Sequence, residues 1–395
     1  MREVGIVGVG HTKFGKTDQD FLTMLGEAAL LCLDDAGVAP GPGAGIDQVL
    51  VASMGGGMVN RISASASALV DTLHLCPAMA ECVENGPASG ASAVKLGYMA
   101  IASGMCDCVL VVGGEKMNGK GGAAATDFVS TMLHPEAEYA YGLTLTAFVA
   151  MFTRLIVEKY GVTAEDMARV AVKNHENAMH NPDAQLHKRV TLKELTEGPD
   201  LERKNPLVAD PLRRYDMCPM SDGAAAVLLC AMEQAEHFAK PPVRIAGIGQ
   251  ATDTHVVANR AVPTDLLAVR LAAQRAYAMA GLGPEDMDVA ELHDAFQILE
   301  IVESEEVGFF PRGKGHLAVR RGDTALGGSI PINPSGGLKA KGHPLGATGV
   351  SQVVEIVRQL RREAGARQVE GAKAGLCVNF GGFGNNVVAT VLTRA

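Results

Sequence analysis

The chain has no tryptophan, and aromatic residues make up only 4% of its 395 residues. Small residues are prominent in the hydrophobic 47%. This composition suits close packing of helices on sheets and does not suit a binding surface lined by aromatic rings. Uninterrupted apolar runs of about 18 residues are also absent, which excludes a membrane-spanning helix. We therefore expect a chain with a sizeable core and no membrane partner.

The sequence has no cysteine pattern typical of a disulfide framework or a zinc site. The eight cysteines are scattered, and only Cys106 and Cys108 are closely spaced. Paired zinc ligands usually occur as Cys-x₂-Cys with a second pair elsewhere, and Cys108 begins an apolar run typical of a strand. We expect no metal site and no disulfide framework, which favours the reducing cytoplasm. Met1-Arg-Glu leads directly into an apolar strand, so we also expect no signal peptide.

Positive charge is in deficit, because the formal net charge is −9. This argues against nucleic acid or an anionic membrane surface as a main partner. Basic residues do cluster locally, at Lys339 and Lys341 and at Arg213-Arg214. Such clusters are sufficient for the phosphates of a coenzyme, although a solvated turn is the alternative for the arginine pair.

A weak internal repeat is present. The pattern over residues 28–49 recurs over residues 272–289, with Ala-Ala, Ala-Gly, Pro and an apolar-Asp pair in the same order. Both copies predict an amphipathic helix, a glycine stop and a buried strand. The next elements match as well, each a helix followed by an apolar strand: residues 88–103 with 108–112, and residues 347–362 with 374–378.

Alternating helices and continuous apolar strands predict an α/β fold of parallel sheets covered on both faces. Two such halves imply a pseudo-twofold arrangement that brings the helix starts near residues 87 and 346 to a shared centre. A segment richer in charge, Met, His and Tyr separates them, and we interpret it as an inserted loop or lid domain. The predicted division is 1–116 with 217–240 for the N-terminal half, 117–216 for the insertion, and 241–395 for the C-terminal half.

Two histidines are candidate catalytic residues. The glycine-rich turn over residues 333–349 places His343 just before an apolar helical stretch, where a base with backbone N–H groups nearby is expected. His293 follows an apolar strand over residues 289–292, and the ends of parallel strands are where sites form. A structural histidine at a turn and a strand-end hydrogen bond are the respective alternatives.

The sequence Val83-Glu-Asn-Gly-Pro-Ala-Ser-Gly90 has the shape of a nucleophile turn leading into a helix, but Pro87 stands where a nucleophile would be expected. Proline fits the first turn of a helix well. It has no nucleophilic atom and no N–H group to donate to an oxyanion.

In order and spacing these motifs resemble the thiolase superfamily, in particular its unorthodox bacterial and archaeal, sterol-carrier-type branch. The resemblance covers nearly the whole chain. It implies a five-layer αβαβα fold and an enzyme that makes or breaks C–C bonds next to a thioester carbonyl. The motifs that carry it are Val83-Glu-Asn…Ala-Ser-Gly90, Gly113-Gly-Glu-Lys-Met117, Asp210-Pro-Leu212, Ser221-Asp-Gly-Ala-Ala225, His293-Asp-Ala-Phe296, Asn333-Pro-Ser-Gly-Gly337, Gly342-His-Pro-Leu-Gly-Ala-Thr-Gly349 and Asn379-Phe-Gly-Gly-Phe-Gly384.

The resemblance implies roles for individual residues. His343 matches the histidine that activates the nucleophile, and His293 matches the His or Asn that helps hold the enolate oxygen. Aimed donors of this kind are worth about 3–4 kcal/mol each. Cys377 lies near the acid/base cysteine of other thiolases and is a third catalytic candidate, with an inert buried cysteine as the alternative. Further oxyanion or substrate-binding candidates come from two motifs: Asn333, Gly381 and Gly382.

Two positions depart from the family pattern. Thiolases have cysteine at the position of Pro87, and sterol-carrier-type thiolases have an acid/base cysteine at the position of Ala295. Both departures argue against covalent thiolysis by the usual route. Cys82, on the strand predicted before Pro87, is a candidate relocated nucleophile, and core packing is its alternative.

Three functions remain open. The first is a thiolase-like acyl-CoA acyltransferase with a non-standard nucleophile. The second is a retro-aldolase on a β-hydroxyacyl-CoA, with His343 as base and His293 holding the enolate, which explains Pro87 more simply. The third is an inactive acyl-CoA-binding subunit of a complex. We expect coenzyme A as substrate or product and no tightly bound cofactor. The resemblance further implies a homodimer or larger oligomer and a small OB-fold, zinc-ribbon partner.

Overall fold

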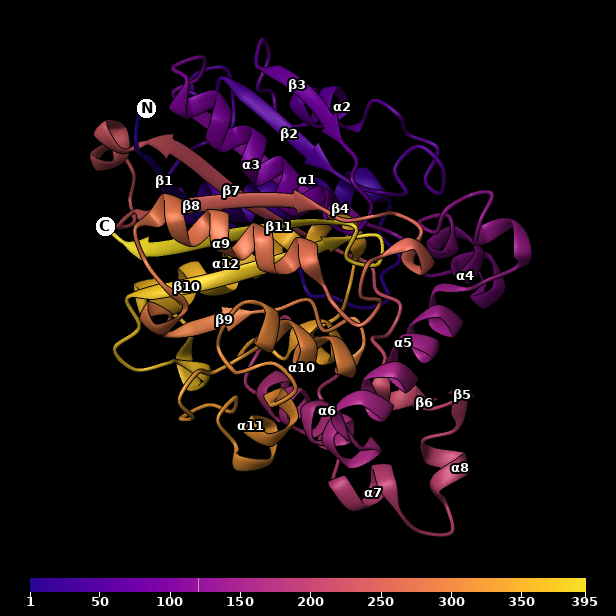
Figure 1. Ribbon diagram of the computed structural model, residues 1–395. Coiled ribbons are helices and arrows are strands. Elements are labelled where there is room, and N and C mark those ends of the chain that lie inside the picture. The colour runs from indigo at the N-terminus through magenta and orange to yellow at the C-terminus, as the bar shows by residue number, and fades with distance from the viewer. Residues whose placement is uncertain (120) are drawn as a thin grey trace.

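The computed structural model describes residues 1–119 and 121–395. Its described strands form one mixed nine-stranded sheet, in the order β3-β2-β4-β7-β1-β8-β11-β10-β9, and a small two-stranded sheet (Figure 1). The strands of the large sheet are β1 (Val4–His11), β2 (Gln48–Ala52), β3 (Met79–Val83), β4 (Cys108–Glu115), β7 (Gly223–Ala231), β8 (Val243–Thr252), β9 (Val289–Glu291), β10 (Ala374–Gly381) and β11 (Asn386–Arg394).

The order of the strands repeats on the two sides of the sheet. Outward from the centre the first half reads β1, β7, β4, β2 and β3, and the second half reads β8, β11, β10 and β9. Between them, β1 pairs with β8 through Gly5–Arg244 and Ile6–Val243. The two halves are therefore nearly separate sheets, as the pseudo-twofold repeat predicts.

The prediction of purely parallel sheets is wrong. β2 is parallel to β3 and β4, and β9 is parallel to β10. In contrast, β7 is antiparallel to β1 and β4, and β11 is antiparallel to β8 and β10. The chain turns back directly from β10 into β11, and a parallel pair would need a crossover of a dozen or more residues. β7 begins beside the end of β4, where Gly223 pairs with Glu115. The preceding Asp222 fixes this start by accepting a hydrogen bond from Met117 N–H (2.7 Å).

Helices cover both outer faces and fill the space between the two halves (Figure 1). Three apolar clusters hold this five-layer αβαβα arrangement together, one beneath each outer helix layer and one around the central helices. None of the helices formed by the described residues is long and apolar enough to cross a membrane. The outer helices of the first half are α1 (Phe21–Ala36) and α2 (Ser65–Thr72), that of the second half is α9 (Leu267–Ala280), and the central pair is α3 (Ser89–Ala102) and α12 (Leu345–Arg361).

The two central helices pack closely at their starts. A Cβ atom at Gly90 of α3 would lie 2.8 Å from the carbonyl oxygen of Gly346 and 2.9 Å from the nitrogen of Val350 in α12, so this crossing requires glycine. The contact brings Pro87, two residues before α3, towards His343, two residues before α12. The predicted approach of the helix starts near residues 87 and 346 is confirmed.

The segment between β4 and β7 is mainly helical and extends beyond one edge of the layers (Figure 1). Phe148 and Phe152 on its longest helix pack edge-on against Phe383, with ring centroids 4.9 and 5.1 Å apart, which attaches the segment to the second half. Its elements are α4 (Gly122–Ser130), α5 (Leu145–Tyr160), α6 (Ala164–Ala178), α7 (Leu192–Thr196), α8 (Leu201–Lys204), β5 (Leu207–Ala209) and β6 (Leu212–Arg213); α10 (Gln297–Glu306) and α11 (Gly315–Arg321) follow β9.

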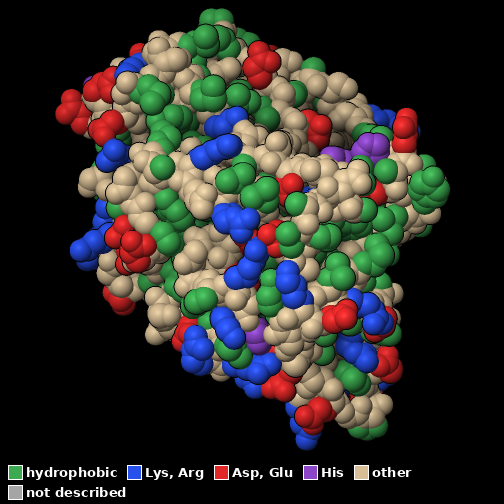
Figure 2. Space-filling model, in the orientation of Figure 1, with side chains coloured by type: hydrophobic (Ala, Val, Ile, Leu, Met, Phe, Trp, Pro, Cys, Tyr) green, Lys and Arg blue, Asp and Glu red, His purple; other side chains and the backbone are tan. Residues whose placement is uncertain are grey.

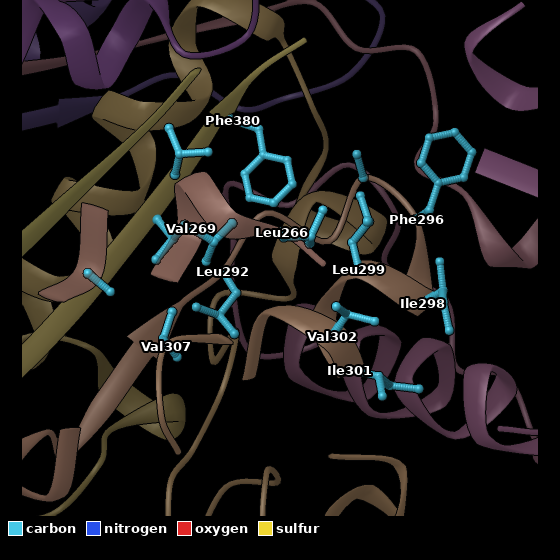
Figure 3. Close-up of a cluster of buried hydrophobic side chains, with 14 of the residues drawn as sticks. Leu266, Val269, Leu292, Phe296, Ile298, Leu299, Ile301, Val302, Val307 and Phe380 are labelled. Carbon is cyan, nitrogen blue, oxygen red and sulfur yellow. The ribbon is translucent and has the colours of Figure 1, made fainter. Parts of the chain in front are cut away.

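A large apolar cluster holds the chain that follows β9. Figure 3 shows Leu292, Phe296 and Leu299 in this cluster together with Leu266 and Phe380. All five side chains are buried, and full burial of a side chain of this size stabilises the fold by about 1.5–3 kcal/mol. The residues on both sides of His293 are therefore firmly anchored.

Asp222, just before β7, joins this strand to two neighbouring loops. It is fully buried, and its Oδ1 accepts from the backbone N–H groups of Met117 (2.7 Å) and Asn118 (2.8 Å). Its Oδ2 accepts from Thr17 N–H (3.3 Å) and lies 3.7 Å from Lys116 Nζ. One carboxylate thus serves three backbone donors and one ammonium group.

We expect Asp222→Ala to lower the free energy of unfolding by about 3 kcal/mol, because buried N–H groups lose their acceptor and Lys116 loses its counter-ion. Urea denaturation followed by circular dichroism measures this change. Asp18 is exposed nearby and makes no side-chain hydrogen bond within the described part of the chain. Asp18→Ala should therefore shift stability by less than about 0.5 kcal/mol. Equal stability of the two variants would contradict this role for Asp222.

Candidate active site

A cavity of about 260 Å³ lies where the first half, the insertion and the second half meet. Apolar side chains form most of its wall, among them Met117, Met132, Leu145, Met217, Phe296 and Phe380. The polar groups on it are few: the imidazoles of His293 and His343, the thiol of Cys218, and the hydroxyls of Thr126, Ser130 and Thr146. An apolar cavity with a few convergent polar groups is the usual form of a small-molecule site.

His343 lies between a short π-helix (Gly337–Lys341) and α12. Its backbone N–H donates to Ser221 Oγ (2.9 Å), and its ring Nδ1 lies 2.7 Å from Thr348 Oγ1. The Thr348 hydroxyl can donate its single proton to the carbonyl of Pro344 (3.0 Å), and in this arrangement Nδ1 carries the ring proton. Nε2 keeps its lone pair, and none of the described residues hydrogen-bonds to it. His343 therefore presents a proton acceptor to the cavity.

His293 follows β9 and has the opposite tautomer. Its Nδ1 lies 3.2 Å from Asn379 Nδ2 and 3.5 Å from the backbone N–H of Phe380. Both groups are donors, so Nδ1 accepts and Nε2 carries the proton. The Phe380 ring stacks on the imidazole at 5.1 Å, and the backbone N–H of His293 donates to buried Glu303 (2.9 Å). The ring is thus fixed on two sides with an N–H group left to donate.

The two imidazoles are neighbours, with ring centroids 4.9 Å apart and planes at 86°. Burial lowers the pKa of His343 to about 3, and the charge of Lys341 acts in the same direction. Burial also lowers the pKa of His293 well below its ordinary value, assisted by His343. Both rings are therefore neutral at neutral pH. One N–H donor and one lone pair side by side can hold an oxygen that gains negative charge while a proton is removed.

Pro87 forms part of the cavity wall in the turn before α3. Ser89 fixes this turn, because its hydroxyl accepts from Asn85 N–H (2.8 Å) and donates to the Gly86 carbonyl (2.5 Å). Gly382, with a left-handed φ of 63°, also lines the cavity. The position expected for a nucleophile thus faces the cavity but offers only a proline ring.

Asn333 and Gly381 are not among the residues that line the cavity. The Asn333 side chain accepts from Leu292 N–H (2.8 Å) and donates to Glu300 (2.7 Å), and its carbonyl accepts from Asn177 (3.0 Å). With these bonds Asn333 fixes the backbone that leads into His293. Its placement therefore suits support of the site rather than contact with substrate.

Cys377 and Cys82 also lie outside the cavity lining. Cys377 is buried in the apolar cluster between the two halves, and this burial raises its thiol pKa well above the ordinary value. Cys82 is on the exposed edge strand β3, with its sulfur 3.4 Å from Ser65 Oγ. Neither placement supports a role in the chemistry of this cavity.

Cys218 is the cavity thiol that sequence reasoning missed. It lies three residues before the Ser221-Asp-Gly motif, and this closeness was the available signal. The aromatic side chains of the insertion are pocket candidates by composition, but the wall is formed by other residues. Those that do not line the cavity are Phe128, Tyr139, Tyr141, Phe148 and Phe152.

Lys339 and Lys341 do not fit the role of binding coenzyme phosphates. Both are buried; Lys341 Nζ pairs with Glu291 (3.2 Å), and Lys339 Nζ donates to the carbonyl of Met217 (2.7 Å). Both ammonium groups therefore have partners inside the fold. The prediction that this pair binds coenzyme phosphates is wrong.

Comparisons with known proteins complete the description of the site. The family model "Thiolase, N-terminal domain" matches residues 4–233, and "Thiolase C-terminal domain-like" matches residues 249–394. The chain belongs to the thiolase family. This confirms the resemblance, the fold and the enzyme class that the sequence predicted.

Relatives within the thiolase family carry different names. An acetyl-CoA acetyltransferase of Methanothermobacter thermautotrophicus is 41% identical over 395 residues, which is 100% of both chains. Sterol carrier protein 2 of Oryctolagus cuniculus is 34% identical over 98% of this chain and 71% of its own. Among solved structures, the Ltp2-ChsH2(DUF35) aldolase is similar with a TM-score of 0.82 and 25% identity, over 99% of this chain and 98% of its own.

Proposed function

We propose that this thiolase-family chain cleaves a β-hydroxyacyl-CoA by retro-aldol chemistry, without a covalent acyl-enzyme. The observation that carries the proposal is Pro87 in the wall of a cavity that also holds two neutral imidazoles. Thiolysis needs a nucleophile that takes up the acyl group. Retro-aldol cleavage leaves the thioester intact and needs only a base and a site for the enolate oxygen.

The complementary tautomers match the two requirements of this cleavage. His343 Nε2 removes the proton of the β-hydroxyl group, the bond between the α- and β-carbons breaks, and its electron pair forms the enolate of the thioester. The β-carbon leaves as an aldehyde or ketone. His293 Nε2–H donates to the enolate oxygen, where negative charge develops in the transition state.

The surroundings of the cavity suit an acyl-CoA. Its apolar wall accommodates the acyl chain, and the low polarity strengthens the hydrogen bond to the enolate. Lysine and arginine side chains gather over the lower half of the face in Figure 2. Four basic side chains line a surface hollow beside Tyr215, two residues from Met217 in the cavity wall, and they are suited to anionic phosphates: Lys188, Arg203, Lys204 and Arg214.

Acyl transfer is the second candidate function. The relative that is 41% identical is named an acetyl-CoA acetyltransferase, and a thiol, Cys218, is present in the cavity. The aldolase with a TM-score of 0.82 favours the first proposal. The two reactions differ in their use of free coenzyme A, which thiolysis consumes and retro-aldol cleavage does not.

We expect the protein to convert a β-hydroxyacyl-CoA into equal amounts of an aldehyde or ketone and a shortened acyl-CoA, without added coenzyme A. A series of short- and medium-chain β-hydroxyacyl-CoA and β-ketoacyl-CoA thioesters tests this, with the carbonyl product trapped by a hydrazine and the thioesters separated by chromatography. Cleavage of only the β-keto series, with one coenzyme A consumed per cleavage, would replace retro-aldol cleavage by thiolysis.

Association with other chains is part of the proposal. β3 lies at the edge of the sheet, and its Met79 is 43% exposed, which is typical of a strand that pairs with another copy. Association with a partner chain is supported by the Ltp2-ChsH2(DUF35) aldolase and by the relative named benzoylsuccinyl-CoA thiolase subunit BbsB of Thauera aromatica, which is 33% identical over 93% of this chain and 92% of its own. That this partner is a small OB-fold, zinc-ribbon protein stays a prediction.

A further inference from the structure

In the proposed cleavage, one proton transfer has no residue assigned as its donor. The enolate must gain a proton at its α-carbon before a stable acyl-CoA can leave. His293 donates to the enolate oxygen, and its Nδ1 is occupied by Asn379 and Phe380. His343 holds the proton from the hydroxyl group. A third group beside the enolate can deliver this proton directly to carbon.

Cys218 lies at the right place in the wall. Its backbone N–H donates to the carbonyl of Ala295 (2.9 Å), and the preceding Met217 pairs with Phe296 in an isolated antiparallel bridge. The segment 217–220 therefore runs beside the segment that follows His293. Cys218, Ala295 and His293 all line the cavity, so the thiol shares one space with the donor imidazole.

Two observations independent of the thiol show that this space is built for a ligand. His293 is 3% and His343 is 7% exposed, and the Nε2 atom of each has no hydrogen-bond partner among the described residues. Neither Nε2 atom is fully buried, so each opens onto the cavity, where a ligand or water can form the missing hydrogen bond. The cavity around Cys218 thus contains an unused donor and an unused acceptor.

The surroundings of Cys218 keep its thiol protonated and also contain a cation that stabilises the thiolate formed when the proton leaves. Burial raises the thiol pKa to about 12, while the nearby ammonium of Lys339 acts in the opposite direction. Lys339 is fixed by its bond to the Met217 carbonyl (2.7 Å) and lies 4.7 Å from the centre of the Tyr215 ring. A neutral thiol is a weak nucleophile and can donate a proton, and the fixed cation stabilises the thiolate that results.

We propose that the Cys218 thiol is the catalytic acid that protonates the α-carbon of the enolate. This inference rests on the proposed retro-aldol function. The sulfur–hydrogen bond breaks, its proton forms the new α-carbon–hydrogen bond, and its electron pair stays on sulfur as thiolate. The thiolate then takes the proton that His343 Nε2 removed from the hydroxyl group. Thiol and neutral imidazole are both restored, and no oxidant or further reactant is required.

Exchange of α-hydrogens with solvent tests this step apart from C–C cleavage. Acetyl-CoA and propionyl-CoA are incubated with the protein in heavy water, and deuterium at the α-carbon is measured by mass spectrometry. We expect exchange with the wild type and a loss of about 100-fold or more with Cys218→Ala and Cys218→Ser. Cys82→Ala is the matched control, since Cys82 is a thiol outside the cavity, and it should exchange like the wild type.

Affinity for coenzyme A and the melting temperature should be unchanged in both Cys218 variants, which separates a chemical role from a structural one. Should neither variant fold, Cys218→Val, which fills a similar volume without a thiol, takes their place and should show the same loss of exchange.

Three other results would contradict the role of Cys218, and one of them would also contradict the retro-aldol function. Exchange at the wild-type rate without the Cys218 thiol overturns the role of Cys218 and leaves the retro-aldol proposal intact. No exchange by the wild type overturns both, because no enolate forms. An acyl group on the Cys218 sulfur during turnover overturns the proton-donor role and makes this residue the nucleophile of an acyl transfer.

Discussion

His343→Ala should lower kcat/KM for C–C cleavage by about 100- to 10,000-fold, the usual contribution of a positioned general base. The substitution removes the lone pair at Nε2, and the described cavity wall contains no carboxylate that could replace it. The imidazole is neutral because burial lowers its pKa to about 3, so the loss should have the same size from pH 6 to pH 8. Initial rates of carbonyl release over this pH range measure it.

His237→Ala is a suitable control, because His237 is an exposed histidine that does not line the cavity and should be replaceable without loss. Coenzyme A binding and the melting temperature of His343→Ala should stay close to those of the wild type. An unchanged rate would show that His343 is not the base. A clear loss in a variant that still folds and assembles would exclude the interpretation of the chain as an inactive binding subunit.

His293→Ala should lower kcat by about 100- to 1,000-fold and change KM much less. Its Nε2–H donates to an oxygen that becomes strongly negative only in the transition state, and loss of such a donor costs about 3–4 kcal/mol. Steady-state kinetics with the substrate identified by product analysis separate the two parameters. A rise in KM with kcat unchanged would mean that His293 binds substrate and transition state equally.

His293→Asn makes the same prediction more specific. Its amide keeps a donor near the oxygen, although the side chain is shorter than imidazole, so part of the lost rate should return relative to His293→Ala. The result would be explained by packing alone if Asn and Ala had equal rates, since the stacking contact with Phe380 at 5.1 Å is lost in both.

The two histidines come from one half of the chain, whereas the cavity wall as a whole draws on all three parts of it. His293 follows β9 and His343 precedes α12, both in the second half. Pro87 comes from the first half, and Met132 and Leu145 come from the insertion. The two imidazoles are thus held on the second half, Cys218 comes from the chain just before β7, and the shape of the acyl site depends on how the insertion packs over them. Differences in that segment are the natural means of changing the substrate.

Local sequence patterns alone were sufficient to predict several elements of the fold, the family and two site residues. The repeat predicted both central helices and their following strands, because apolar periodicity and glycine stops are local signals. Motif order identified the family and selected His293 and His343, and a proline without a nucleophilic atom needs no structure to be recognised at residue 87. These conclusions depend on which residues are present and on short spacings along the chain.

The tertiary structure decided what depends on contacts between distant segments. The directions of β7 and β11, the opposite tautomers of the two imidazoles, the internal role of Asn333 and the burial of Lys339 and Lys341 have no local signature. Cys377 and Cys218 illustrate the reason. Both are single cysteines in the sequence, yet one lies between packed sheets and the other in the cavity wall. A side chain's exposure and partners are determined by the elements that pack against it, and those lie far away along the chain.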